Sequence, residues 1–236
     1  MTAGLVAART VDGVGYLRLT RADTRNAISH PLVEEAAAAM KELVRSGVRV
    51  AVLEADPPVF CSGNDLSEVS EMTDAASTAV VGFIEAMLAS PLLWIGSVSG
   101  AALGGGMAIV AACPVALASD QAWFALTERR LGFFPAGVLP YLEVVMDVRP
   151  AFRAALTGRE IPAAEAATLG LVDEVHPLEQ LAGRVHEMAT DLCARPGIAD
   201  AGREVWQRRF RAPEMIERRA QLDEVLLEYG TSGNTV

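Results

Sequence analysis

Along the first half of the chain, short apolar segments alternate with segments in which apolar residues recur at helical spacing. Apolar runs rich in β-forming residues predict strands over 14–19, 48–55, 91–98 and 114–119. Apolar residues at helical spacing predict helices over 31–45 and 107–112. Pro31 suits the first turn of the earlier helix and Gly47 its end. This alternation predicts an α/β fold with a mostly parallel sheet buried under helices.

The pattern changes to mainly helical from about Val138 onward. A helix is expected from Pro162 to Gly170, with a β-prone segment after it. Amphipathic segments predict two more helices, over 181–195 and 213–229, and the last seven residues read as a frayed tail. We therefore divide the chain into an α/β core, residues 1–180, and a helical region, residues 181–236.

Composition and charge narrow the classes of protein to which the chain can belong. With 51% hydrophobic and 21% charged residues, the 236-residue chain has the balance of a soluble globular protein. Its net charge of −10 argues against nucleic acid or an anionic membrane as the main partner. The three cysteines, an odd number at unrelated spacings, indicate no disulfide framework and favour the cytoplasm. Neither a signal peptide nor an apolar run long enough to span a membrane is recognisable.

Two glycine-rich turns carry the first candidate chemistry. At "CSGND" (61–65) and "LGGGM" (103–107), a predicted strand ends, glycine permits a sharp turn and a helix is expected to begin. A helix start offers free backbone N–H groups and the positive end of the helix dipole. Two such starts facing each other would form an oxyanion hole. Alternatively, the glycines only permit tight packing of helix on strand, and the local pattern favours neither reading.

Carboxylates are the remaining acid–base candidates. The sequence has no dinucleotide fingerprint, phosphate-binding loop, nucleophile elbow or metal-ligand spacing, and its three histidines are scattered. Glu128 lies between an apolar strand and an apolar turn in "WFALTERRLGFFPAG". Partial burial there would raise its pKa into a range useful for proton transfer. The local sequence alone favours another reading, an ion pair with Arg129, Arg130 or another arginine.

Four motifs in the same order resemble the crotonase superfamily, the enoyl-CoA hydratase/isomerase family. The resemblance covers residues 14–175 and continues more weakly into the C-terminal helices. "RADTRNAIS" (21–29) is similar to a loop that binds coenzyme A. "VFCSGNDL" and "VSGAALGGGM" are similar to the segments that supply the two oxyanion N–H groups, here those of Asn64 and Gly105. "LTGREIPAAEAATLGLVDEV" resembles a segment downstream of the catalytic centre.

The resemblance implies a spiral core of repeated β-β-α units and an acyl-CoA thioester as substrate, with no separate cofactor and no metal. It also implies a homotrimer or a dimer of trimers, with subunit contacts in the C-terminal helices. The matched coenzyme A positions are Arg25, Ala27, Asn64, Asp65, Leu66, Ser67, Gly104 and Gly105. Arg25 would pair with a phosphate or remain an exposed loop arginine. Asp65 reads best as a helix cap, with polarisation of a group in the site as the alternative.

One departure from the family pattern bears on the reaction. The hydratases that the chain resembles have two catalytic glutamates. In this chain, Ala108 occupies the place of the first and Glu128 matches the second. Where some isomerases carry another glutamate, this chain has Ala136. "LTERRLGFF" resembles the single-glutamate enoyl-CoA isomerases, so the leading hypothesis is 3-enoyl- to 2-enoyl-CoA isomerisation with Glu128 as the base. A hydratase, lyase or decarboxylase is the second hypothesis, and an acyl-CoA-binding subunit with little catalysis is the third.

The acyl chain has two candidate contact regions in the sequence. "MLASPLLW" (87–94) and "LGFFPAGVLPYL" (131–142) are apolar enough to line a tunnel for it. Segments of this composition more often form ordinary core, and the sequence leaves both readings open.

Overall fold

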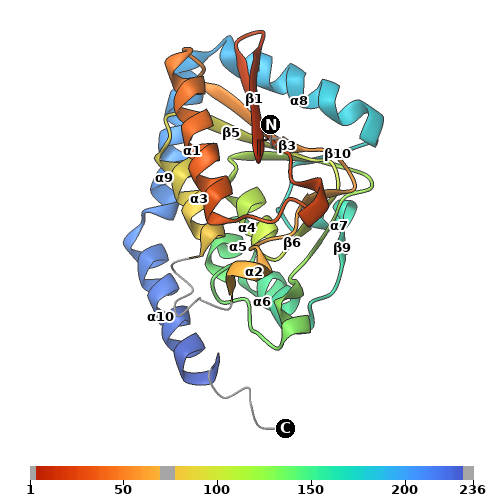
Figure 1. Cartoon of the computed structure of the whole chain (residues 1–236), viewed down its shortest axis with the longest axis vertical. Coiled ribbons are helices and arrows are strands. Elements are labelled where there is room, and N and C mark those ends of the chain that lie inside the picture. Colours follow the sequence, from red (N-terminus) through yellow and green to blue (C-terminus); the bar gives the residue numbers. More distant parts are fainter. Residues whose placement is uncertain (1–3, 70–77, 231–236) are drawn as a thin grey trace.

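The computed structural model describes residues 4–69 and 78–230, which form two sheets surrounded by helices (Figure 1). In the larger sheet, β1 pairs antiparallel with β2 and the remaining neighbours are parallel. Its strand order is β1 (Val6–Val11), β2 (Val14–Leu19), β3 (Val50–Ala55), β5 (Leu93–Val98), β7 (Val115–Ser119) and β10 (Glu174–His176). The smaller sheet is formed by β4 (Val59–Cys61), β6 (Ala101–Leu103), β8 (Trp123–Ala125) and β9 (Ile161–Pro162).

A β-β-α unit is repeated along the core. Each unit places its first strand in the larger sheet and its second strand in the smaller sheet, and then adds helical structure. β3 and β4 precede α2 (Leu66–Val69) and α3 (Ala79–Ala89), and β5 and β6 precede α4 (Gly105–Ala112). β7 and β8 precede the 3₁₀ helix η3 (Thr127–Leu131) and α5 (Leu139–Val145). The spiral of β-β-α units expected from the resemblance is therefore present; β4 and β6 lead into the two glycine turns, and β8 leads into η3.

Helices cover both faces of the larger sheet. α1 (His30–Arg45) begins where Ser29 Oγ accepts the Leu32 N–H, with Pro31 in the first turn, and packs its apolar face into the main core. α8 (Leu178–Cys193) covers the other face through Leu181, Val185 and Ala189. The remaining helices are α6 (Val148–Thr157), α7 (Ala163–Thr168), α9 (Pro196–Phe210) and α10 (Pro213–Gly230). α10 lies at the opposite end of the molecule from α8 (Figure 1).

The sequence prediction is confirmed for the central strands and for α1, α7, α8 and α10, and it is incomplete elsewhere. β1, α3 and α9 were not predicted. All but the first residue of β1 are exposed, so that strand lacks an alternating apolar face. α9 contains Gly197 and Gly202, which weaken its helical signal. The expected tail lies outside the described residues apart from Gly230, the last residue of α10, and the division at residue 180 stays a prediction.

The helix expected to begin at Gly63 starts later in the structure than predicted. α2 begins only at Leu66, because the residues before it pair with the loop that precedes α1. The helix predicted over 107–112 begins two residues earlier, at Gly105. None of the helices over residues 4–69 and 78–230 combines the length and the apolar character needed to cross a membrane.

Candidate active site

The two glycine turns contact each other directly. A Cβ atom built on Gly63 would lie 3.0 Å from the backbone nitrogen of Gly105 and 3.1 Å from the carbonyl oxygen of Leu103. One built on Gly106 would lie 2.5 Å from the Cys61 carbonyl oxygen. Gly63 also has a φ of +91°, which side chains rarely permit. Glycine is therefore required for the turn after β4 to approach the start of α4.

Both predicted donor N–H groups are available at this junction. Gly105 is the first residue of α4, so its N–H has no carbonyl four residues earlier within the helix. On either side of Asn64, the Ile28 N–H donates to Gly63 O (2.8 Å) and the Asp65 N–H donates to Ile28 O (2.9 Å). This parallel bridge leaves the Asn64 N–H on the side of the strand away from Ile28. Among the described residues, neither N–H has a hydrogen-bond acceptor.

The electrostatic environments of the two donors differ. Gly105 stands at the N-terminus of an eight-residue helix, where the helix dipole favours negative charge. Asn64 lies in an extended bridge and not at a helix start, so the dipole expected there from the sequence does not apply to it. The helix dipole therefore acts on this junction through α4.

The side chain of Asn64 connects the first turn to α3. Its Oδ1 accepts the Val80 N–H at 3.0 Å, and Thr78 Oγ1 accepts the Val81 N–H at 3.2 Å in the same first turn. A Cβ on Gly105 would lie 2.7 Å from Val80 Cγ2, so the Val80 side chain packs against the second donor. The sequence analysis missed this role of Val80 because it did not predict α3.

The carboxylate of Glu128 lies beside the second turn. η3 follows β8 and places Glu128 Oε1 2.7 Å from the position of a Cβ on Gly104. Oε2 is buried without a hydrogen-bond partner among the described residues. Burial raises the pKa of Glu128 from its ordinary value of 4.5 to about 7, against the opposing effect of a hydrogen bond from its own backbone N–H. A desolvated carboxyl group with one unpartnered oxygen thus adjoins the candidate oxyanion hole.

The ion pair that the local sequence favoured for Glu128 is absent from the described structure. Arg130 faces Glu160, with 3.9 Å between Nη2 and Oε1, and Arg129 Nη1 donates to the Thr157 carbonyl at 3.3 Å. Both arginines are exposed, whereas the Glu128 carboxyl group turns inward. Consecutive charged residues on a 3₁₀ helix project in different directions, and this explains why the local interpretation was wrong.

Among the described residues near the turns, Ala108, Ala136 and Cys61 do not supply a second proton carrier. Ala108 is fully buried in α4 and Ala136 is buried after η3. Burial raises the pKa of the Cys61 thiol to about 12, so this group stays protonated at neutral pH. No set of three or more His, Cys, Asp or Glu side chains in 4–69 and 78–230 could hold a metal ion. Glu128 is therefore the candidate proton carrier.

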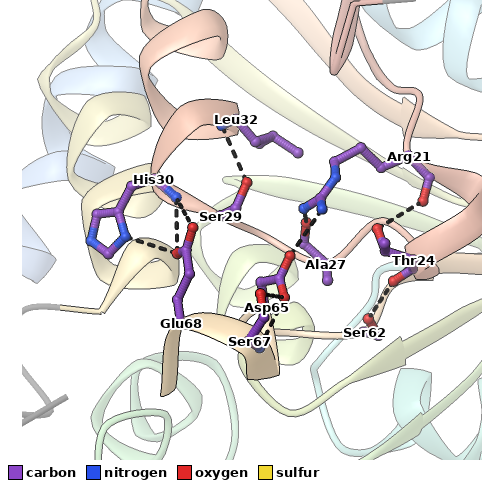
Figure 2. A network of polar contacts seen from close by, with 10 residues as sticks. All are labelled: Arg21, Thr24, Ala27, Ser29, His30, Leu32, Ser62, Asp65, Ser67 and Glu68. Atoms are coloured by element: carbon purple, nitrogen blue, oxygen red, sulfur yellow. Dashed lines mark hydrogen bonds and ion pairs between the residues drawn. The ribbon is translucent and has the colours of Figure 1, made fainter. Parts of the chain in front are cut away.

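The loop that precedes α1 lies against the Asn64 segment (Figure 2). Arg25 is exposed, has a φ of +56°, and its carbonyl accepts the Ser62 N–H at 3.1 Å. Ala27 is buried, and its carbonyl accepts a hydrogen bond from Arg21 Nη1 at 2.7 Å. Leu66 and Ser67 are exposed on α2. The matched positions of the loop therefore lie beside those of the Asn64 segment, although Ala27 is buried and its carbonyl already has a partner.

Asp65 caps the short helix α2. Its Oδ1 accepts both the Ser67 N–H (3.1 Å) and the Ser67 hydroxyl (2.7 Å). Its Oδ2 accepts a hydrogen bond from Arg21 Nη2 at 2.9 Å. The Ser67 hydroxyl, followed by Arg21, lowers the pKa of Asp65. Both oxygens of the carboxylate are therefore engaged in holding the turn.

The two apolar segments considered for the acyl chain differ in their surroundings. Met87 and Leu92 are fully buried in the main core. Phe133, in the later segment, keeps about half of its surface exposed and lies two residues after the end of η3. The earlier segment therefore contributes to the core in the described structure, and the later one adjoins the element that carries Glu128.

Burial of Glu128 has a consequence for stability. Because its folded-state pKa is raised, the contribution of Glu128 to the stability of the wild-type protein is expected to be lost as pH rises from 4.5 through about 7. The shift corresponds to about 3 kcal/mol at about 1.4 kcal/mol per pKa unit. The free energy of unfolding is measured with denaturant at pH 5 and at pH 8. Between these two pH values, Glu128→Gln should become more stable relative to wild type by up to this amount. Glu34→Gln, at an exposed position, is the control; parallel behaviour of all three proteins would contradict burial of the Glu128 charge.

Comparisons with known proteins show the family and the fold of the chain. The family model described as enoyl-CoA hydratase/isomerase matches residues 9–232. An enoyl-CoA isomerase/hydratase of Penicillium crustosum is 32% identical over 83% of this chain, which spans only 24% of that protein. A probable enoyl-CoA hydratase of Mycobacterium leprae is 33% identical over 77% of this chain and 74% of its own length. The crystal structure of an enoyl-CoA hydratase from Mycobacterium avium superposes with a TM-score of 0.81, at 28% identity, over 98% of this chain and 100% of that chain.

Proposed function

Since the chain belongs to the enoyl-CoA hydratase/isomerase family, we propose that it isomerises an acyl-CoA thioester from the 3-enoyl to the 2-enoyl form. The observation that carries this proposal is a buried carboxyl group, with one oxygen unpartnered, beside two backbone N–H groups that have no acceptor among the described residues. The relatives include proteins named for isomerisation and for hydration, so the choice of reaction rests on the side chains of this site.

The proposed reaction is a proton shift along one face of the substrate. The N–H groups of Asn64 and Gly105 hold the thioester oxygen, and Glu128 removes a proton from carbon 2. The C–H electron pair becomes the carbon 1–carbon 2 double bond of a dienolate, whose oxygen carries the negative charge. Glu128 then returns the proton to carbon 4, which leaves the double bond between carbons 2 and 3. One base is sufficient, because the same carboxyl group accepts and donates the proton.

Hydration needs more than the described residues of this site supply. A water molecule must be activated while a proton is delivered to the neighbouring carbon, a task for which two carboxylates are well suited. Ala108 is methyl-bearing and fully buried, so it neither orients nor deprotonates water.

We expect isomerisation of 3-hexenoyl-CoA to be at least about 100-fold faster than hydration of 2-hexenoyl-CoA, because general acid–base groups typically contribute that factor or more. Conjugation is followed by ultraviolet absorbance, and the products are separated by mass. Addition of 18 Da at a comparable rate would instead support a hydratase, and loss of carbon dioxide from a carboxylated acyl-CoA would support a decarboxylase. Tight acyl-CoA binding without turnover across the substrate panel would support the binding subunit.

Binding and assembly are part of the same proposal. Arg25 would contact a coenzyme A phosphate, an assignment supported by its exposed position on the loop beside the Asn64 segment. The nucleotide portion would lie along that loop and the exposed start of α2. A homotrimer or a dimer of trimers, with contacts from the C-terminal helices, would be the assembled form, which sedimentation of the purified protein tests.

A further inference from the structure

Arg21 joins the loop that precedes α1 to the segment that carries Asp65 (Figure 2). We call residues 21–28 the front loop and residues 62–67 the donor segment. The Arg21 guanidinium donates through Nη1 to the Ala27 carbonyl within the front loop, and through Nη2 to Asp65 in the donor segment. Only 17% of the Arg21 side chain and 15% of the Asp65 side chain are exposed. This is therefore a largely buried bridge and not a surface ion pair.

Backbone hydrogen bonds continue the bridge on both sides of Asn64. The Ser62 N–H donates to the Arg25 carbonyl, and Ile28 bonds to the residues before and after Asn64. Asn64 itself makes no backbone hydrogen bond to the front loop among the described residues. The direction of its N–H is therefore set by neighbours that are themselves fixed by the front loop.

The energetics of the pair favour a geometric role. Burying two charges costs desolvation energy that their attraction often does not exceed, so such pairs contribute little net stability. A planar guanidinium with two acceptors nevertheless fixes distance and angle between the groups that it joins. The front loop needs such fixing, since Arg25 and Asn26 both have left-handed backbone angles, with φ of +56° and +54°.

We propose that Arg21 and Asp65 are positioning residues that hold the Asn64 N–H in its catalytic direction. The pair does this by tying the carbonyl of Ala27 to the cap of α2, one residue beyond the donor. This inference rests on the proposed function, because it assumes that the Asn64 N–H holds the thioester oxygen. Neither side chain needs to contact the substrate, which distinguishes their role from the phosphate contact proposed for Arg25.

The test measures carbonyl polarisation separately from turnover. Arg21→Met, Asp65→Asn and the double variant are compared with wild type for kcat and KM on 3-hexenoyl-CoA. The same proteins are titrated with 2,4-hexadienoyl-CoA, whose absorption moves to longer wavelength as an oxyanion hole polarises its carbonyl. We expect kcat to fall about 10- to 100-fold, as small misplacements of catalytic groups can do, with KM within about threefold. The red shift should shrink in each single variant, and the double variant should be no worse than either, because the residues act as one unit.

The outcomes distinguish failure of this inference from failure of the proposed function. A wild-type protein that binds hexadienoyl-CoA without a red shift has no oxyanion hole, and both proposals then fall. A normal wild-type shift that the variants keep in full, or a rise in KM alone, overturns only the positioning role. Asp65→Asn is nearly isosteric and carries the test if Arg21→Met does not fold. Arg49→Gln removes the exposed pair with Asp200 and should leave kcat and the red shift at wild-type values.

Discussion

Replacement of Glu128 by glutamine is expected to lower kcat for 3-hexenoyl-CoA isomerisation by about 10³-fold, within the range for loss of a general acid–base group. The amide is nearly the same size as the carboxyl group, so the Gly104 turn that it contacts should keep its shape. Binding of the thioester should change little, because the Asn64 and Gly105 N–H groups are untouched. Steady-state kinetics and titration with a non-reacting acyl-CoA measure the two effects separately.

The pH dependence follows from the same carboxyl group. A base must be ionised to accept a proton, and burial raises the pKa of Glu128 to about 7. The wild-type kcat/KM should therefore rise as pH increases toward about 7 and level off above it. The raised pKa also makes the carboxylate a stronger base than an exposed glutamate, at the cost of being only partly ionised near neutrality.

Two results would contradict the role given to Glu128. A Glu128→Gln variant with wild-type kcat would place the proton transfer on another group. A kcat/KM that is flat from pH 5 to pH 9 would show that no group titrating near 7 acts as the base. Glu34 is exposed and lies far from Glu128 in the sequence, so Glu34→Gln controls for the loss of one negative charge. Folding of each variant is checked by circular dichroism before the kinetics are interpreted.

The parts of the fold that sequence predicts are those in which burial creates a regular pattern. β5 is buried at every position, and α1 has both a Ser29 cap and an apolar stripe, so each produces a clear signal. β1 is an exposed edge strand held by pairing with β2, a long-range interaction that local pattern does not contain. α3 is apolar on nearly all sides, which removes the polar face that marks an amphipathic helix.

The residues of the candidate site likewise fall into those that a local motif reveals and those that only tertiary contacts reveal. The glycines and Glu128 are recognisable because their chemistry demands those residue types in fixed motifs. The partners of these residues come from elsewhere in the chain: Val80 packs on Gly105, and Arg21 reaches Asp65 across 44 positions. Local charge pattern even misassigned Glu128 to its arginine neighbours, because a side chain's direction on η3 depends on the surrounding packing. Tertiary contacts therefore decide what the motifs can do.

Substitution of Gly63 by alanine is expected to reduce kcat by about 10²- to 10³-fold, the usual consequence of losing one oxyanion donor. The new Cβ would lie 3.0 Å from the Gly105 nitrogen and 3.1 Å from the Leu103 carbonyl oxygen. Both are backbone atoms, so they cannot rotate away as a flexible side chain could. Either the methyl group covers the Gly105 N–H or the donor segment moves away from α4. In both cases the two N–H groups cease to act on one oxygen, and the red shift of bound hexadienoyl-CoA should shrink with kcat.

The strain of alanine at a positive φ must be separated from this local effect. Gly47 has a φ of +84°, close to the +91° of Gly63, and a Cβ there would meet nothing within 4 Å. Gly47→Ala should therefore lose stability by about 1–3 kcal/mol, as a strained backbone does, and keep wild-type kcat. Gly63→Ala should show a similar or larger loss of stability together with the loss of activity. Equal kcat in the two variants would mean that contact between the glycine turns is not required for catalysis, and the oxyanion assignment would then have to be abandoned.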